Sequence, residues 1–223
     1  EAQLMPYIQS CNIACGGHAG DEDLMNSVVA LAIKHKVKIG AHPSYPDKEN
    51  FGRKTMIIEP NELKASIQNQ INSLREIVKK KGSTLHHIKP HGALYNDIAK
   101  NNELSVCFLD AILPYKKDVK LYVPYNSVIE KNALKKGFMI IYEAFADRNY
   151  NDDLSLVSRE EKGALITNPK HIFLHVFEML NANKVITITG KKQYIKATTF
   201  CVHSDTKNAL EILKRLNQKR MQL

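Results

Sequence analysis

The stretch that decides the fold is Asn12-Ile13-Ala14-Cys15-Gly16-Gly17-His18-Ala19-Gly20-Asp21. It begins as a short apolar run and ends in a glycine-rich turn that carries an imidazole and a carboxylate. Apolar residues then recur at the spacing of one helix face, at Leu24, Val28, Leu31 and Ala32. We therefore expect a buried strand at residues 12–15, a turn with reactive side chains at its C-terminal end, and a helix that Asp21 caps.

The same layout of apolar run, polar turn and helix recurs along the chain. Further strands are predicted at residues 38–41, 85–89, 120–123, 138–144, 184–188 and 200–203. Strand, turn and helix in succession, with few hairpin signals, is typical of parallel βαβ units. About six such units fit in 223 residues, so we expect a single α/β domain over residues 1–223.

Proline, glycine and capping residues mark where elements begin and end. Pro43 cannot continue a central strand, Pro60 opens a long amphipathic helix and Gly82 ends it. A further helix is expected from about Ala93, broken near residues 101–102, and the residues 204–205 are expected to cap a closing helix. The loop between residues 43 and 58 is long for an α/β unit, and such loops often cover binding sites.

Composition excludes several classes of function. The net charge is +9, but the lysines are spread over predicted helix faces and no nucleic-acid-binding motif is present, so a solvated surface is the favoured interpretation. The cysteines, which form no CxxC pair, are Cys11, Cys15, Cys107 and Cys201. Free thiols, the lack of a signal peptide and the lack of an 18-residue apolar run favour a cytoplasmic protein that binds neither membrane nor nucleic acid.

Polar side chains follow the predicted strands at the end where parallel α/β enzymes place their catalytic groups. In chain order they are His18 and Asp21, His42 and Ser44, Lys89 and His91, Asp147 and Arg148, and His203 and Asp205. We expect these side chains to meet at one mouth. Taken singly, each has an ordinary structural role as well, since Asp21 and Asp205 are also good helix caps. The other histidines fall inside strand or helix patterns and are interpreted as structural.

Three chemistries are open to such a set. Histidines and aspartates could bind a divalent metal that activates water, or could act directly as general base and acid on a carbonyl. Lys89 and Arg148 could neutralise phosphate or carboxylate oxygens. The glycines near residue 17 let backbone N–H groups approach an anion. Neither a Walker motif nor a GxSxG elbow is present.

Six motifs in order along the chain carry a family resemblance. They are Asn-Ile-Ala-Cys-Gly-Gly-His-Ala-Gly-Asp (12–21), Ile-Gly-Ala-His-Pro-Ser-Tyr-Pro-Asp (39–47), Asn-Phe-Gly-Arg (50–53), Ile-Lys-Pro-His-Gly-Ala-Leu-Tyr-Asn (88–96), Glu-Ala-Phe-Ala-Asp-Arg-Asn-Tyr (143–150) and, more weakly, Val-His-Ser-Asp (202–205). With these motifs the sequence resembles the LamB/YcsF family. The resemblance implies an irregular (β/α) barrel of about seven parallel strands, similar to the glycoside hydrolase/deacetylase superfamily. The family begins with a strand reading like Asp-Leu-Asn-x-Asp-Leu-Gly-Glu, and we expect that first strand to be missing from this chain.

The implied activity is that of the A subunit of an ATP-dependent 5-oxoprolinase. Together with subunits B and C, it converts 5-oxo-L-proline, ATP and water to L-glutamate, ADP and phosphate. ATP is thus the implied co-substrate, with Mg²⁺ as its expected companion and the presence of an intrinsic transition metal left open.

The resemblance also suggests roles for individual residues. His18, Asp21, Lys89, His91 and Asp147 are the candidate catalytic residues, with His91 or His18 as the base. The candidate substrate- or phosphate-binding residues are Asn12, His42, Asn50, Arg53, Arg148, His203 and Asp205. The three aspartates Asp21, Asp147 and Asp205 would orient imidazoles or hold Mg²⁺.

Two other functions stay open at this point. One is a metal-dependent, deacetylase-like hydrolase that cleaves C–N bonds without ATP. The other is a non-catalytic protein that serves as a scaffold for its partners. The sequence also leaves homo-oligomerisation open.

Overall fold

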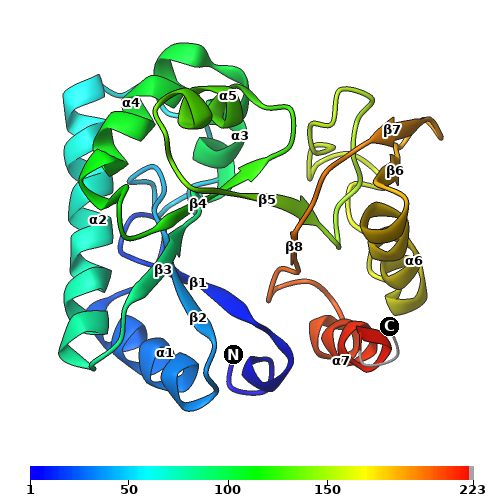
Figure 1. Cartoon of the computed structure of the whole chain (residues 1–223), viewed down its shortest axis with the longest axis horizontal. Coiled ribbons are helices and arrows are strands. Elements are labelled where there is room, and N and C mark those ends of the chain that lie inside the picture. The colour runs from blue at the N-terminus through cyan, green and yellow to red at the C-terminus, as the bar shows by residue number, and fades with distance from the viewer. Residues whose placement is uncertain (221–223) are drawn as a thin grey trace. The chain divides into compact units, whose positions relative to one another are not determined.

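The structure, a computed structural model, describes residues 1–220, which divide into two compact units. The first unit contains residues 9–123 and 127–140, and the second contains residues 1–8, 124–126 and the chain from residue 141 onward. Each unit combines α-helices with short β-strands (Figure 1). The expectation of one domain over residues 1–223 stays a prediction, and the last three residues of that range lie outside the described part of the chain.

Four parallel strands form the sheet of the first unit. They are β1 (Ser10–Ala14), β2 (Lys38–His42), β3 (Leu85–Ile88) and β4 (Lys120–Pro124), hydrogen-bonded in that order. The register between β2 and β3 shifts at Gly40, where an added Cβ would lie 2.1 Å from Nε2 of His87. Glycine is therefore required there for the two strands to approach. Because the strands are parallel, their C-terminal ends share one edge of the sheet.

The helices of the first unit follow the predicted boundaries closely. They are α1 (Glu22–Lys34), α2 (Pro60–Lys80), α3 (Gly92–Lys100), α4 (Asn102–Ile112) and α5 (Val128–Lys135), with a 3₁₀ turn η2 (Leu113–Tyr115). The predicted break is confirmed, because the Asn101 side chain accepts a hydrogen bond from the Leu104 N–H and starts α4. The predicted apolar face of α2 is buried, with Ile67, Ile71 and Leu74 fully covered, and α2 packs against α1 and α4 (Figure 1).

The second unit contains β5 and the rest of the chain. Its elements are η1 (Met5–Tyr7), β5 (Ile140–Phe145), α6 (Pro169–Asn181), β6 (Lys184–Ile186), β7 (Lys192–Tyr194), β8 (Thr199–Cys201) and α7 (Ala209–Arg220). β5 and β8 pair in parallel, with Ala144 opposite Phe200. A core of Ala146, Ile172 and Ile212 lies between the helices and these strands. The parallel α/β class predicted from the sequence is thus confirmed.

Two predictions about the second unit were wrong in detail. β6 pairs with β7 in an antiparallel hairpin, which the sequence analysis missed because the turn at residues 187–191 lacks a two-residue Asn-Gly or Asp-Gly signal. The closing helix begins at Ala209 and not directly after Asp205. The residues between them form turns instead, with the Ala209 N–H donating to the Thr206 carbonyl.

Two expectations about the chain as a whole can be compared with the described residues. No helix within residues 1–220 combines the length and the apolar character needed to cross a membrane. None of the four cysteines forms a disulfide in this part of the chain.

Candidate functional site

Three imidazoles meet at the C-terminal edge of the sheet in the first unit. His18 lies in the turn after β1, His42 is the last residue of β2, and His91 caps α3 just after β3. The rings of His18 and His91 stack with centroids 3.7 Å apart, and the His42 ring lies edge-on to both, at 4.8 Å from His91 and 5.7 Å from His18. Three residues from separate strand ends therefore form one cluster.

Nitrogen atoms of two of these rings lie close to backbone carbonyl oxygens. Nδ1 of His42 lies 2.7 Å from the Lys89 carbonyl oxygen, and its Nε2 lies 3.0 Å from Nδ1 of His91. Nε2 of His91 in turn lies 2.9 Å from the Phe51 carbonyl oxygen. Nδ1 of His18 is buried and has no hydrogen-bond partner among the described residues. The cluster thus contains one ring with an unused nitrogen and two rings linked in a chain.

The surroundings keep these imidazoles neutral near pH 7. Burial lowers the pKa of His18 to about 4, and the nearby charge of Arg53 contributes to this shift. Burial, His18, Lys89 and Arg53 lower the pKa of His91 to about 3, although the Phe51 carbonyl acts in the opposite direction. The pKa of His42 is also well below its usual range, chiefly because of burial. Neutral imidazoles can accept a proton, which is what a general base must do.

The long loop after β2 closes over the cluster. Phe51 places its ring edge-on to His18 and to His91, at 5.0 and 5.3 Å, while 42% of the residue stays exposed. Arg53 is exposed and lies over the Phe51 ring. Asn50 is half-buried, and its side chain donates to the Asp47 carboxylate within the same loop. Sequence analysis identified Asn50 and Arg53 but missed Phe51, whose only signal was an aromatic residue in a polar loop.

A glutamine on α2 fixes the start of this loop. Gln70 is buried, its Oε1 accepts from the Ser44 N–H and its Nε2 donates to the Ser44 carbonyl. Gly17 leaves the space for this contact, since a Cβ there would lie 2.3 Å from Gln70 Oε1. The sequence analysis also missed Gln70, although a glutamine on the apolar face of a helix was a signal that could have been used.

Three other predicted residues of the first unit have clear structural contacts. Asp21 is exposed and caps α1 by accepting from the Leu24 N–H, as the capping interpretation requires. Oδ1 of Asn12 lies 2.8 Å from Nε2 of the fully buried His87, within the strand layer. Lys89 is 3% exposed, and its ammonium group lies 5.7 Å from the Tyr95 ring. Lys89 is therefore a cation that the first unit encloses almost completely.

A second polar network forms in the second unit. Asp147 is fully buried and accepts from the His203 N–H and from the Thr206 hydroxyl, while Nδ1 of His203 lies 3.0 Å from both carboxylate oxygens. Burial raises the pKa of Asp147, but these hydrogen bonds outweigh it and lower the pKa below its usual value. Thr206 was missed, because a threonine in a turn gives no signal of its own.

The remaining predicted residues of the second unit lie beside this network. Arg148 is buried and donates to the Val157 carbonyl, and burial lowers its pKa to about 10. Asp205 is exposed. The structure therefore brings Asp147 and His203 into contact. Arg148, the residue after Asp147, bonds instead to the Val157 carbonyl.

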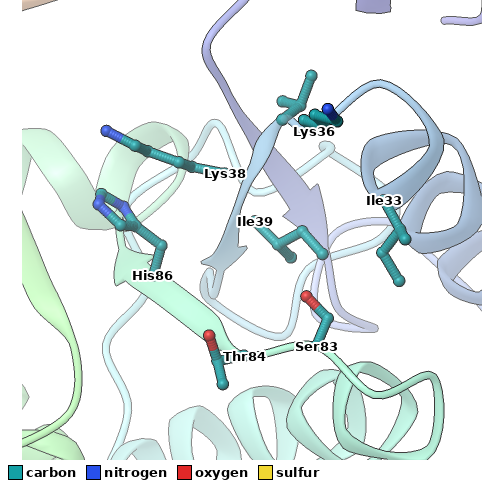
Figure 2. Close-up of a pocket in the computed structure, with 8 residues that line it drawn as sticks. Ile33, Lys36, Lys38, Ile39, Ser83, Thr84 and His86 are labelled. Carbon is teal, nitrogen blue, oxygen red and sulfur yellow. The ribbon is translucent and has the colours of Figure 1, made fainter.

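A separate pocket of about 310 Å³ lies at the opposite, N-terminal end of β2 and β3. Figure 2 shows its lining, which includes Lys36, Lys38, Ser83, Thr84 and His86. None of the predicted site residues lines it. Its position at the N-terminal strand ends sets it apart from the imidazole cluster.

Comparisons with known proteins agree with the motifs. The model of the LamB/YcsF family matches residues 1–222. A protein of Alkaliphilus metalliredigens described as the A subunit of 5-oxoprolinase is 40% identical over 218 residues, which cover 98% of this chain and 85% of that protein. A protein of Pyrococcus abyssi with the same description is also 40% identical over 218 residues, covering 98% of this chain and 86% of that protein.

A solved structure agrees with these relatives. The crystal structure of the lactam utilization protein from Thermus thermophilus is similar with a TM-score of 0.91 and 33% identity, covering 99% of this chain and 88% of that one. Fold, motifs and relatives therefore lead to the same assignment. The chain belongs to the LamB/YcsF family.

Proposed function

We propose that this chain is the A subunit of an ATP-dependent 5-oxoprolinase and acts with subunits B and C. The relatives described as the A subunit of 5-oxoprolinase, which align over nearly the whole chain, support this function. The similar structure from Thermus thermophilus, described as a lactam utilization protein, supports a lactam as the substrate class.

The reaction needs an activated amide, a cationic site and a base. The lactam of 5-oxo-L-proline is stabilised by resonance, so water attacks it slowly. Transfer of the γ-phosphoryl group of ATP to the lactam oxygen gives ADP and makes the ring carbon electrophilic. Water then attacks that carbon and loses a proton to a base, and the C–N bond breaks with protonation of the nitrogen, which leaves γ-glutamyl phosphate. A second water hydrolyses this acyl phosphate to L-glutamate and phosphate. Positive charge near the phosphoryl oxygens stabilises the transition state of each step.

The observation that carries this proposal is the cluster of neutral imidazoles beside two cations. His18 and His91 are the candidate bases, because both lie in the cluster and both are neutral, and so free to accept a proton, near pH 7. Lys89 and Arg53 are the two cations, and the positive charge of each lowers the pKa of His91. In the second unit, we propose that Asp147 orients His203 and that Arg148 and Asp205 assist in binding.

Two of the three carboxylates predicted to orient imidazoles or hold Mg²⁺ are already engaged by groups of the protein. Both oxygens of Asp147 are engaged by His203 and Thr206, and Asp21 is engaged as a helix cap. No group of three or more histidines, cysteines and acidic residues within residues 1–220 has an arrangement suited to a metal ion. The proposal therefore assigns Mg²⁺ no ligand from these residues. A cytoplasmic location, where ATP is available, belongs to the same proposal.

The test is ADP release from this chain mixed with subunits B and C, with and without 5-oxo-L-proline. We expect ADP and L-glutamate to form in equal amounts, and only when the lactam and this chain are both present. His91→Ala should lower the turnover number by about 100-fold or more, as expected for loss of a general base. His171→Ala, at an exposed position on α6, is the matched control and should keep the wild-type rate.

Wild-type turnover by His91→Ala would remove His91 from the mechanism. Hydrolysis that needs no ATP and stops when metal is chelated would replace the proposal with the metal-dependent hydrolase. Lactam-dependent ADP release without this chain would indicate the scaffold function.

A further inference from the structure

The contacts of His42 and His91 need more protons than two neutral rings possess. The pair makes three close polar contacts, of 2.7, 3.0 and 2.9 Å, to the Lys89 carbonyl, to each other and to the Phe51 carbonyl. A carbonyl oxygen only accepts hydrogen bonds, so each outer contact requires a proton on the ring nitrogen that faces it. The central contact requires a third proton, and two neutral imidazoles carry two.

The Lys89 contact fixes the position of the proton on His42. It is the shortest of the three, and its carbonyl belongs to the segment that leaves β3, where the Lys89 N–H is bonded to the Ala41 carbonyl. Nδ1 of His42 therefore carries the proton of His42, and its Nε2 can only accept. To satisfy Nε2, His91 must carry its proton on Nδ1. Nε2 of His91 then carries a lone pair that faces the Phe51 carbonyl oxygen. That oxygen has no proton to donate, so Nε2 has no hydrogen bond there.

The groups that face the pair disfavour a third proton. His18 stacks on His91, and the charges of Lys89 and Arg53 both act on that ring. His18 and Lys89 also act on His42. Burial disfavours a charged ring, and Lys89 and Arg53 are cations that repel an added positive charge on the pair. The neutral pair, with one unsatisfied contact at Phe51, is the state expected near pH 7.

We propose that His42 is a positioning residue that holds the proton of His91 on Nδ1, so that Nε2 of His91 is the base that receives the proton of the attacking water. The Phe51 carbonyl occupies the place of that water until substrate is bound. The role of the water rests on the proposed function, whereas the tautomer of His91 does not.

The Phe51 carbonyl is suited to leave. Phe51 is 42% exposed in the long loop and has a φ of +54°, a left-handed conformation that is strained for a residue with a side chain. Rotation of the Phe51–Gly52 peptide, about ψ of Phe51 and φ of Gly52, would remove the carbonyl from His91 and would exchange the hydrogen bond from the Gly52 N–H to the Asp47 carbonyl for one to water. A water O–H, unlike the carbonyl, can donate to Nε2. When water replaces the Phe51 carbonyl at Nε2 of His91, an unfavourable contact therefore becomes a hydrogen bond.

The experiment is nitrogen NMR of the whole chain labelled with ¹⁵N-histidine, at pH 7 and without ATP, lactam or partner subunits. The signals of the two rings are assigned from the variants His42→Asn and His91→Asn. We expect both His42 and His91 to be neutral and protonated on Nδ1. Protonation of His91 on Nε2, or a positively charged pair at pH 7, would overturn the proposal.

The variant His42→Asn tests the coupling between the rings. An asparagine can still donate to the Lys89 carbonyl but has no counterpart of Nε2, so His91 should move its proton to Nε2 and donate to Phe51. An unchanged His91 tautomer in this variant would contradict the positioning role. His86→Gln is the matched control, because His86 lies on the neighbouring strand β3 but contacts His87, and it should leave the His91 signals unchanged.

The assay of ADP release then links the tautomer to turnover. His42→Asn should lower kcat by about 10²–10⁴-fold, the range associated with loss or misorientation of a base, with little change in KM. Unchanged kcat would overturn the catalytic part of the proposal. The expected tautomers without any lactam-dependent ADP release would instead overturn the proposed function and leave the positioning of His91 intact.

Discussion

Asp147 shows how one buried carboxylate organises its surroundings. Its side chain is fully buried and accepts hydrogen bonds from the backbone and side chain of the segment that follows β8. These partners lie 56 and 59 residues further along the chain. The sequence predicted Asp147 and His203 as site residues because each follows a strand. It could not predict their contact, because that contact depends on the pairing of β5 with β8.

Asp147→Asn should lower the free energy of unfolding by about 1–3 kcal/mol, because a buried donor loses its charged acceptor. The pKa of Asp147 is lowered in the folded state, so its contribution is present above the unfolded pKa of about 4 and is lost as pH falls through the folded value. The difference between variant and wild type in urea unfolding should therefore shrink below about pH 4. Glu178→Gln, at an exposed position on α6, is the control and should stay within about 0.5 kcal/mol of wild type. An equal difference at pH 7 and at about pH 3 would contradict the assigned charge state.

At the scale of elements, helix boundaries were easier to predict than strand partners. Pro60 and Asn101 set helix starts through local geometry and local hydrogen bonds, so their effect is visible in the sequence. β7 has three residues and no strong turn signal, and its pairing with β6 depends on contacts that form only in the folded chain. The start of α7 shifted for a related reason, because Thr206 bonds to Asp147 instead of opening a helix.

Helix α2 has an apolar face in the core and also carries Gln70, which holds the backbone of Ser44 through two hydrogen bonds. Gln70→Ala leaves the N–H and the carbonyl of Ser44 without their side-chain partner in a buried place. We expect a loss of about 1–3 kcal/mol in the free energy of unfolding and faster amide exchange at Ser44. Glu76→Ala, at an exposed position on the same helix, should change stability by less than about 0.5 kcal/mol. Slow, wild-type exchange at Ser44 in Gln70→Ala would show that the glutamine does not hold the loop.

At the scale of the whole molecule, the repeating order of strand, turn and helix was sufficient to predict a parallel α/β fold. It also predicted that His18, His42 and His91 would meet, because parallel strands end at one edge. The sequence did not reveal the role of the Phe51 carbonyl, since any residue can supply a carbonyl. Nor did it reveal that His87 is held by Asn12 within the strand layer, because a histidine in a strand pattern gives no sign of its partner.

Acid should unfold the first unit because of its buried and half-buried histidines. Four of them have pKa values lowered mainly by burial: His18, His42, His87 and His91. A group whose folded pKa is lowered from about 6.5 takes up its proton more readily when unfolded. The stability that depends on the neutral rings is therefore complete above about pH 6.5 and is lost as pH falls toward the folded values, near 4 for His18 and 3 for His91.

Each such ring should reduce the free energy of unfolding by about 1.4 kcal/mol per pH unit between roughly pH 6 and pH 4.5. The measurement is urea unfolding followed by circular dichroism at several pH values, since the chain contains no tryptophan. His87→Gln removes a fully buried imidazole, so unfolding of the variant should take up about one proton fewer than unfolding of the wild type. The slope of the free energy of unfolding against pH should fall accordingly. Leu74→Ala is the control, since it should lower stability by about 2–5 kcal/mol at every pH without changing the slope. A wild-type slope in His87→Gln would mean that His87 takes up its proton without unfolding, and the link between burial and acid sensitivity would then fail for that ring.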